Sequence, residues 1–384
     1  MKHTSFVRQD PAGVPMSYRG YASQDAARWG ERSGDKRSGI CGRGKFSKKN
    51  HRRESQARFS YREAVLAKTC VILNPASAAG TTGRRQPSIV ARIEAVLGPV
   101  ELRVTDGPGD ARGLARAATE NGCRRILVAG GDGTLSEIAN GILAATKGAA
   151  GGPAIGLLPL GSGWDFARTL GLPRDFEEAL ACIADGRTRA VDALRVDHCD
   201  KTGAPRTGFV VNEASAGLSG AMVRFVGRFA KRLGARLGFA AGALAAIATH
   251  RAEEMCVRID DKEVYMGPVS LIVAANGRYF GAGMSVAPGA IADDGRIEVV
   301  LIRGLSIPRL LKNFPSIFAG THGNHPSVSF YSARKVQISS AGSSPVDLDG
   351  EPLGVIPMDV AILPKVLEVI TGGAKSHDEV EGSR

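Results

Sequence analysis

The chain has 384 residues, of which 43% are hydrophobic and 23% charged, so it can form two globular domains with ordinary cores. Its net charge of +12 lies mostly near the N-terminus, where residues 1–68 hold 16 Lys or Arg against six Asp or Glu. No stretch reaches the roughly 18 apolar residues of a membrane span, and no secretory signal pattern opens the chain. The six cysteines are far apart in the sequence and show no metal-ligand spacing. They fit reduced thiols in a cytoplasmic protein better than a disulfide framework.

Residues 1–67 are rich in Arg, Lys, Ser and Gly with little periodicity, so we expect a disordered basic tail. Three interpretations remain open: a solvated tail, a polybasic anchor for anionic lipid, or a start assigned too far upstream. Nucleic-acid binding is disfavoured because aromatic residues are sparse and no known motif appears.

Residues 68–188 alternate between strand-like and helix-like segments. The expected strands are Thr69–Leu73, Pro99–Val104, Ile126–Gly130 and Pro153–Leu158. The expected helices are Ser88–Leu97, Ala111–Asn121, a helix from about Thr134, and residues 174–187. This alternation predicts a doubly wound parallel α/β domain that binds a nucleotide.

Two of the expected strands end in glycine turns that open helices. In the first turn Asp132 lies among Gly130, Gly131 and Gly133, where backbone N–H groups and a helix N-terminus suit a phosphate and the carboxylate suits Mg²⁺. An ordinary strand-to-helix turn with a capping Asp is the alternative.

The second glycine turn, residues 159–163, is followed by Asp165 and Arg168 on one helical face. These side chains either face a triphosphate or form an exposed ion pair and a cap. Neither turn carries the Gly-Lys-Ser/Thr of a P-loop.

Residues 189–362 read mainly as strands, which predicts a β-sandwich domain that holds a lipid acceptor, followed by a return segment and disordered tail over 363–384. The exception is one long helix over 218–249, with an apolar stripe and basic residues mostly off it. This helix suits a membrane surface or packing on the β domain. Two loops, at 293–295 and 347–351, contain clustered acids. Each could simply be a hairpin turn, or it could bind a cation, and Glu351 could accept a proton from a hydroxyl.

Together these segments resemble the soluble diacylglycerol kinase and sphingosine kinase superfamily, especially its bacterial lipid kinases. The resemblance covers roughly residues 68–370. It rests on Asn-Pro at 74–75, Gly-Gly-Asp-Gly-Thr at 130–134, Pro-Leu-Gly-Ser-Gly-Trp-Asp-Phe-Ala-Arg at 159–168, Asp-Asp-Gly at 293–295 and Asp-Gly-Glu at 349–351. It implies an active site in the cleft between the two domains, with ATP and Mg²⁺ as cofactors.

The resemblance also implies a role for each matching residue. The ATP-binding residues would be Asn74, Pro75, Ala76, Ser77, Ala78, Thr105, Gly131, Asp132, Gly133, Thr134, Leu135, Ser136, Glu137 and Ser162. Asp132, Asp165 and Asp192 would hold the catalytic Mg²⁺ through water, with Arg168 nearby. A second, structural Mg²⁺ would bind Asp294 and the carbonyls of Ile291 and Arg296, and Glu351 would accept the proton.

The sequence departs from the family pattern at several positions. Trp164 stands where Asn is usual, Ala78 and Ala79 where a glycine is usual, and Ser136 where Asn is common. We expect Trp164 to matter most, by reshaping the nucleotide or acceptor pocket or by reducing activity.

The expected function is an ATP- and Mg²⁺-dependent lipid kinase that is cytoplasmic and peripheral to the membrane. Diacylglycerol is the first acceptor, giving phosphatidic acid, and a sphingoid base or ceramide is the second. A catalytically weak lipid- or nucleotide-binding regulator is the alternative, while an NAD kinase should lack the Asp165/Arg168 turn and the 349–351 loop. No nucleic-acid partner is expected, and the oligomeric state, a homodimer included, stays open.

Overall fold

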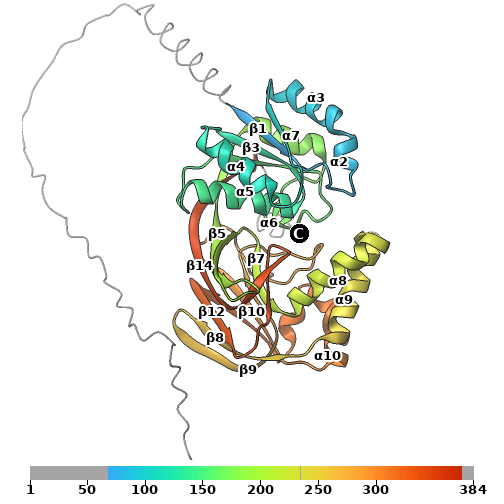
Figure 1. Ribbon diagram of the computed structural model, residues 1–384, viewed down its shortest axis with the longest axis vertical. Coiled ribbons are helices and arrows are strands. Elements are labelled where there is room, and N and C mark those ends of the chain that lie inside the picture. The colour runs from blue at the N-terminus through green and yellow to red at the C-terminus, as the bar shows by residue number, and fades with distance from the viewer. Residues whose placement is uncertain (1–67, 234, 374–384) are drawn as a thin grey trace, which may run out of the picture. The chain divides into compact units, whose positions relative to one another are not determined.

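The computed structural model describes residues 68–233 and 235–373, and the predicted tails at 1–67 and 374–384 lie outside them. The described strands join into one 14-stranded sheet that passes from an α/β part into a β-rich part (Figure 1).

The α/β part is built on four parallel strands in the spatial order β2-β1-β3-β4. They are β1 (Thr69–Leu73), β2 (Glu101–Val104), β3 (Arg125–Gly130) and β4 (Ala154–Pro159). The helices around them are α2 (Thr81–Arg84), α3 (Gln86–Leu97), α4 (Asp110–Glu120), α5 (Asp132–Ala145), α6 (Asp165–Thr169) and α7 (Phe176–Asp185). One face of the sheet packs against α3 and α7, and the other against α4 and α5, so the doubly wound fold is confirmed.

The burial of β1 shows why the prediction worked. All five residues of β1 are buried, because helices cover both faces of the sheet. A parallel strand of this kind is apolar along its whole length and carries no alternation.

The β-rich part consists of antiparallel strands that enclose a second core. They are β5 (Thr188–Cys199), β6 (Pro205–Val210), β7 (Glu213–Gly217), β8 (Glu253–Ile259), β9 (Lys262–Ala275), β10 (Ile297–Arg303), β11 (Val328–Ala333), β12 (Lys335–Ser340), β13 (Pro345–Leu348) and β14 (Glu351–Ile370). This confirms a β-rich second region.

Strand β14 ties the two parts together. It pairs with β13, β12 and β5 along most of its length, and Val369 then pairs in parallel with Ile155 of β4 (Figure 1). The described part of the predicted return segment is therefore the end of this strand.

The prediction of one long helix over 218–249 is wrong. The structure has α8 (Leu218–Leu233) and α9 (Ala235–Thr249), which lie side by side (Figure 1). They meet closely at Gly242, where an added Cβ would be 2.6 Å from the Cα of Val226. A further helix, α10 (Ile307–Phe318), and a short 3₁₀ turn, η1 (His322–Asn324), complete this region.

Helix α8 packs on β7 and β13, and Met222 and Phe225 of its predicted apolar stripe join the core beneath it. Arg224 and Arg228 are exposed. The side chains of four further residues of the predicted helix lie outside the described residues: Lys231, Arg232, Leu233 and Arg236. Of the two arrangements predicted for this helix, the described side chains of α8 show packing on the β-rich region.

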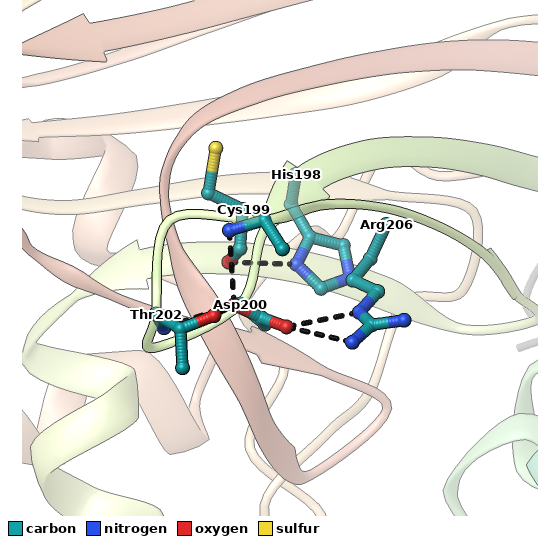
Figure 2. Close-up of polar contacts among 6 residues, drawn as sticks. His198, Cys199, Asp200, Thr202 and Arg206 are labelled. Carbon is teal, nitrogen blue, oxygen red and sulfur yellow. Dashed lines mark hydrogen bonds and ion pairs between the residues drawn. The ribbon is translucent and has the colours of Figure 1, made fainter.

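The turn between β5 and β6 is closed by Asp200 (Figure 2). Its carboxylate accepts hydrogen bonds from the backbone N–H and hydroxyl of Thr202 and from Arg206. These contacts pull the pKa of Asp200 well below its usual range. The neighbouring Cys199 is a free thiol, as are the other described cysteines.

Candidate active site

One cavity of about 1090 Å³ extends from the glycine turns of the α/β part to the space between β7, β9 and helices α8, α9 and α10. Its two ends differ in character. Loop backbone, carboxylates and Arg168 line the end at the strand termini, whereas Met222, Phe239, Leu271 and Phe314 line the other. A ligand with a charged part and a long apolar part would match this division.

The loop after β1 forms one wall of the polar end. The Asn74 side-chain amide donates to the Thr134 hydroxyl at 3.1 Å, and its carbonyl oxygen accepts from the Ala76 N–H at 3.0 Å. These bonds fix the loop against the first glycine turn. Ala78 and Ala79 both have positive φ, 49° and 55°, a conformation that favours glycine and costs an L-residue roughly 1–2 kcal/mol.

The two glycine turns touch each other. An added Cβ on Gly161 would overlap the Cα of Gly131, and one on Gly163 would overlap the carboxylate of Asp132. The contact brings the ends of β3 and β4 together, at the edge where ligands bind in open α/β sheets.

Asp132 links the turns through its carboxylate, which accepts from the backbone N–H of Trp164 at 2.8 Å and of Asp165 at 3.0 Å. It therefore caps the N-terminus of α6 rather than that of its own helix, α5. Burial raises the pKa of Asp132 although these N–H groups oppose the shift.

Asp165 is a buried carboxylate at the polar end, with 4% of its surface exposed. Its Oδ2 accepts from the Ala282 N–H at 3.0 Å, and its Oδ1 is buried without a hydrogen-bond partner. Burial, together with the charge of Asp132, raises the pKa of Asp165 to about 6. The Arg168 guanidinium opposes this shift and lies 5.2 Å from the centre of the Tyr279 ring.

These two carboxylates fit a magnesium ion by their chemistry. The buried Oδ1 of Asp165 lacks a partner, and a carboxylate keeps lone pairs free even when N–H groups contact it. No set of three or more His, Cys, Asp or Glu side chains within residues 68–233 and 235–373 could hold a metal ion by itself. Magnesium is usually bound by one or two carboxylates together with waters and substrate phosphates, so a pair is sufficient.

Glu351 begins β14 and lines the same cavity. Burial of its carboxyl group, followed by the charge of Glu137, raises its pKa. Glu137 also lines the cavity, and it accepts from the N–H groups of Gly109 and Ala111 at the start of α4.

The turn that presents Glu351 is fixed by Asp349, which has a positive φ of 51°. Its carboxylate accepts from the backbone N–H groups of Val211, Asn212 and Glu213 at 2.9–3.0 Å. Ser136, which was predicted to bind ATP, does not line the cavity. Its side chain is hydrogen-bonded to Asp349 instead. The other predicted ATP-binding residues all line the cavity.

Asp192 is not brought together with Asp132 and Asp165. Its carboxylate accepts from the N–H groups of Gly295 at 2.7 Å and Lys365 at 2.8 Å, so it joins the 291–296 loop and β14 to β5. Asp192 does not line the cavity. The role of Asp192 in holding a metal ion stays a prediction from the resemblance.

The loop predicted to bind a second metal ion is held by its own polar contacts. Asp293 forms a two-pronged ion pair with Arg189 at 2.7 Å, and Asp294 accepts from the Arg296 N–H at 2.9 Å. Ile291 is exposed. The second metal ion stays a prediction from the resemblance.

Trp164 does not line the cavity. Its ring is 7% exposed and belongs to the core between the sheet, α4 and α5. Its backbone has a positive φ of 66°, and its indole nitrogen is buried without a partner. The side chain that departs most from the family pattern therefore acts on the packing behind α6.

Among the described residues, five charged ones line the cavity although the sequence predicted no individual role for them: Asp106, Arg174, Glu213, Asp347 and Asp349. Arg174 donates to the Ser162 carbonyl at 3.1 Å, beside the second glycine turn. Asp347 had a usable signal, because it alternates with Asp349 in an extended segment. Glu213 lies between Asn212 and Ala214 and carried no motif.

Comparison with known proteins agrees with this arrangement. The chain matches the diacylglycerol kinase catalytic domain over residues 68–196 and the YegS C-terminal NAD kinase beta sandwich-like domain over residues 212–371. A probable lipid kinase YegS-like protein of Chromohalobacter salexigens is 31% identical over 72% of this chain and 86% of its own length. A diacylglycerol kinase of Staphylococcus carnosus is 28% identical over 78% of this chain and 94% of its own length.

A crystal structure of a putative diacylglycerol kinase from Bacillus anthracis shares the fold, with a TM-score of 0.63 and 23% identity over 80% of this chain and 98% of the other. The architecture is thus that of a lipid kinase with an α/β catalytic domain followed by a β-rich domain. The chain belongs to the diacylglycerol kinase and YegS-like family of lipid kinases, and membership of this family implies the use of ATP.

Proposed function

We propose that this protein transfers the γ-phosphoryl group of ATP to the hydroxyl of a lipid bound in the cavity. The observation that carries the proposal is the continuity of this cavity, which joins the glycine turns to the apolar space under α8, α9 and α10. A reacting hydroxyl at the junction would meet the phosphate end while its chains lie among apolar side chains.

The nucleotide would lie along the loop after β1 and the two glycine turns, where backbone N–H groups and helix N-termini face the phosphates. Arg168 and Arg174 add positive charge there. Asp132 and Asp165 are the residues that would hold Mg²⁺, which supplies charge neutralisation on the phosphates when bound. These groups position the reactants, and phosphoryl transfer depends largely on such positioning.

Glu351 would accept the proton of the lipid hydroxyl. Its raised pKa makes it a stronger base than a glutamate of ordinary pKa, and its place at the start of β14 is fixed by the Asp349 turn. Asp132 and Asp165 are buried and no cationic side chain of the described residues fully neutralises them, so their ionised forms are unfavourable until a cation binds.

Diacylglycerol is the first acceptor we propose, giving phosphatidic acid, because several relatives are named diacylglycerol kinase. A sphingoid base or ceramide is the second. Such acceptors reside in membranes, so we propose a cytoplasmic protein that acts at the membrane surface. Among the described residues, no helix is long and apolar enough to cross a bilayer.

A catalytically weak regulator is less well supported by the geometry. The main reason for that alternative was Trp164, and its ring packs in the α/β core instead of obstructing the cavity.

The proposal is tested by transfer of labelled phosphate from ATP to lipids in mixed micelles. We expect a labelled product from the wild-type protein and from Glu254→Gln, a control at an exposed position on β8. Asp132→Asn and Glu351→Gln should abolish this product. Absence of product with diacylglycerol, sphingoid bases and ceramide alike would contradict the proposal.

A further inference from the structure

Two buried carboxyl groups, Glu213 and Asp347, lie side by side on the sheet face that forms one wall of the cavity. Asp347 of β13 pairs with Ser215 of β7, and Glu213 is two residues from Ser215, so both acids project to the same face. The polar Ser215 lies between them on that face, and the neighbouring Leu271 and Val273 of β9 belong to the core under α8. Glu213 is 1% exposed and Asp347 3% exposed.

Each acid has an oxygen without a hydrogen-bond partner, Oε2 of Glu213 and Oδ1 of Asp347. The charges that perturb the pKa of the two groups are those of other acids, namely Asp349, Glu351 and Asp347 itself. Together with burial they raise the pKa of Glu213 strongly and that of Asp347 to about 7. The Ser215 hydroxyl contacts Glu213 and the Gly350 N–H contacts Asp347, so each acid lacks a partner for one oxygen only. Buried carboxyl oxygens are normally hydrogen-bonded, which leaves room for one donor at each acid.

The position of the acids along the cavity indicates what that partner is. Both residues line the cavity, and Asp347 is four residues before Glu351 in the same hairpin. Met222 and Leu218, which lie beyond them in α8, are apolar. A lipid whose reacting hydroxyl reaches Glu351 therefore brings its next polar group near Glu213 and Asp347, before its chains enter the apolar end.

We propose that Glu213 and Asp347 form a headgroup subsite that accepts a hydrogen bond from an O–H or N–H group adjacent to the reacting hydroxyl of the lipid. This inference rests on the proposed function and narrows its acceptor. A long-chain diol or amino alcohol supplies such a donor, whereas diacylglycerol has an ester at the corresponding position. Of the two acceptor classes proposed above, the subsite therefore favours the second, a sphingoid base, over diacylglycerol, which leaves the two oxygens unpaired.

The test uses three lipids that differ in one group: a monoalkylglycerol, its 2-O-methyl ether and its 2-amino analogue. A hydrogen bond to a buried polar group that is otherwise left unpaired contributes enough to separate matched substrates by about 10- to 100-fold. We expect the wild-type kcat/KM for the diol and the amine to exceed that for the ether by this factor, with an unchanged KM for ATP.

Two changes of the subsite separate charge from polarity. Glu213→Gln combined with Asp347→Asn keeps the shape and removes the charge, so the amine should lose its advantage. Glu213→Met removes the polar group from a buried position and should reduce the preference for the diol to less than about threefold. Replacement of buried charges by apolar residues of similar volume is often neutral or stabilising, so we expect this variant to fold. Glu254→Gln, at an exposed position on β8, should keep the wild-type preference.

Equal preference among the three lipids in the wild-type protein would overturn the subsite, as would a preference that Glu213→Met leaves unchanged. If none of the lipids is phosphorylated, the proposed function fails, and the subsite is then judged by binding of the same labelled lipids without ATP. Tighter binding of the diol and the amine than of the ether, lost in Glu213→Met, supports it, and equal binding of all three overturns it.

Discussion

Replacement of Asp165 by Asn should stabilise the fold while it destroys the proposed site. Asp165 is buried beside Asp132, and its pKa is about 6 instead of the ordinary 3.8. At 1.36 kcal/mol per pKa unit, ionisation of this group disfavours the folded state by ~3 kcal/mol. The side-chain amide introduced by Asp165→Asn would carry no charge and could still accept the hydrogen bond from the Ala282 N–H.

The pH dependence follows from the raised pKa. Between pH 3.8 and about 6 the folded protein binds this proton more tightly than the unfolded chain, so stability falls as pH rises. The penalty is absent below that range and complete above it. The free energy of unfolding of Asp165→Asn should therefore match that of the wild-type protein near pH 4 and exceed it by ~2–3 kcal/mol at pH 8.

Urea unfolding in EDTA at several pH values measures this difference. The exposed Glu254→Gln serves as the control, for which the difference from wild type should not change with pH. An Asp165→Asn protein whose advantage is the same at pH 4 and pH 8 would refute the reasoning, because the charge would then not be the source of the instability.

Three further results are expected. Mg²⁺ at pH 8 should raise the Tm of the wild-type protein but not that of Asp165→Asn, which a thermal melt with and without EDTA would show; equal shifts would argue against this carboxylate as a ligand. Trp164→Asn should reduce the backbone strain of the positive φ, yet destabilise the protein by ~2–4 kcal/mol through the loss of a buried ring. The KM for ATP should not change, and a large change in that KM would mean that the ring contacts the nucleotide. Asp349→Ala should cost at least ~3 kcal/mol in chemical unfolding, since three backbone N–H groups lose their acceptor, and a cost below ~1 kcal/mol would show that water replaces it.

The α/β part was predictable because its determinants are local. An unbroken apolar run such as Thr69–Leu73 followed by small residues specifies a buried parallel strand and its turn without reference to the rest of the chain. The same holds for the glycine turns, where the absence of side chains at Gly161 and Gly163 permits the contact between the turn after β3 and the turn after β4. The cavity-lining residues near these turns were found for that reason.

The less successful predictions depend on long-range contacts. The helical pattern over 218–249 continues through both α8 and α9, and their separation is visible only where Gly242 meets Val226. Asp192 resembles a metal ligand in sequence, but its oxygens accept hydrogen bonds from the N–H groups of Gly295 and Lys365. Such partners are far away in the chain, and spacing within a motif carries no information about them.

The buried acids of the cavity are better explained by ligand binding than by stability. Asp132, Asp165, Glu213, Asp347 and Asp349 all have raised pKa values because they are buried, and neighbouring acids add to the shift at Asp165, Glu213 and Asp347. Each such group weakens the fold at neutral pH, so an apolar replacement would be favoured if packing alone mattered. Asp349 holds a turn, and Asp132 caps α6, which gives these two a structural reason. Asp165, Glu213 and Asp347 instead each keep a buried oxygen without a hydrogen-bond partner. Such an oxygen destabilises the folded protein until a cation or a hydrogen-bond donor binds to it.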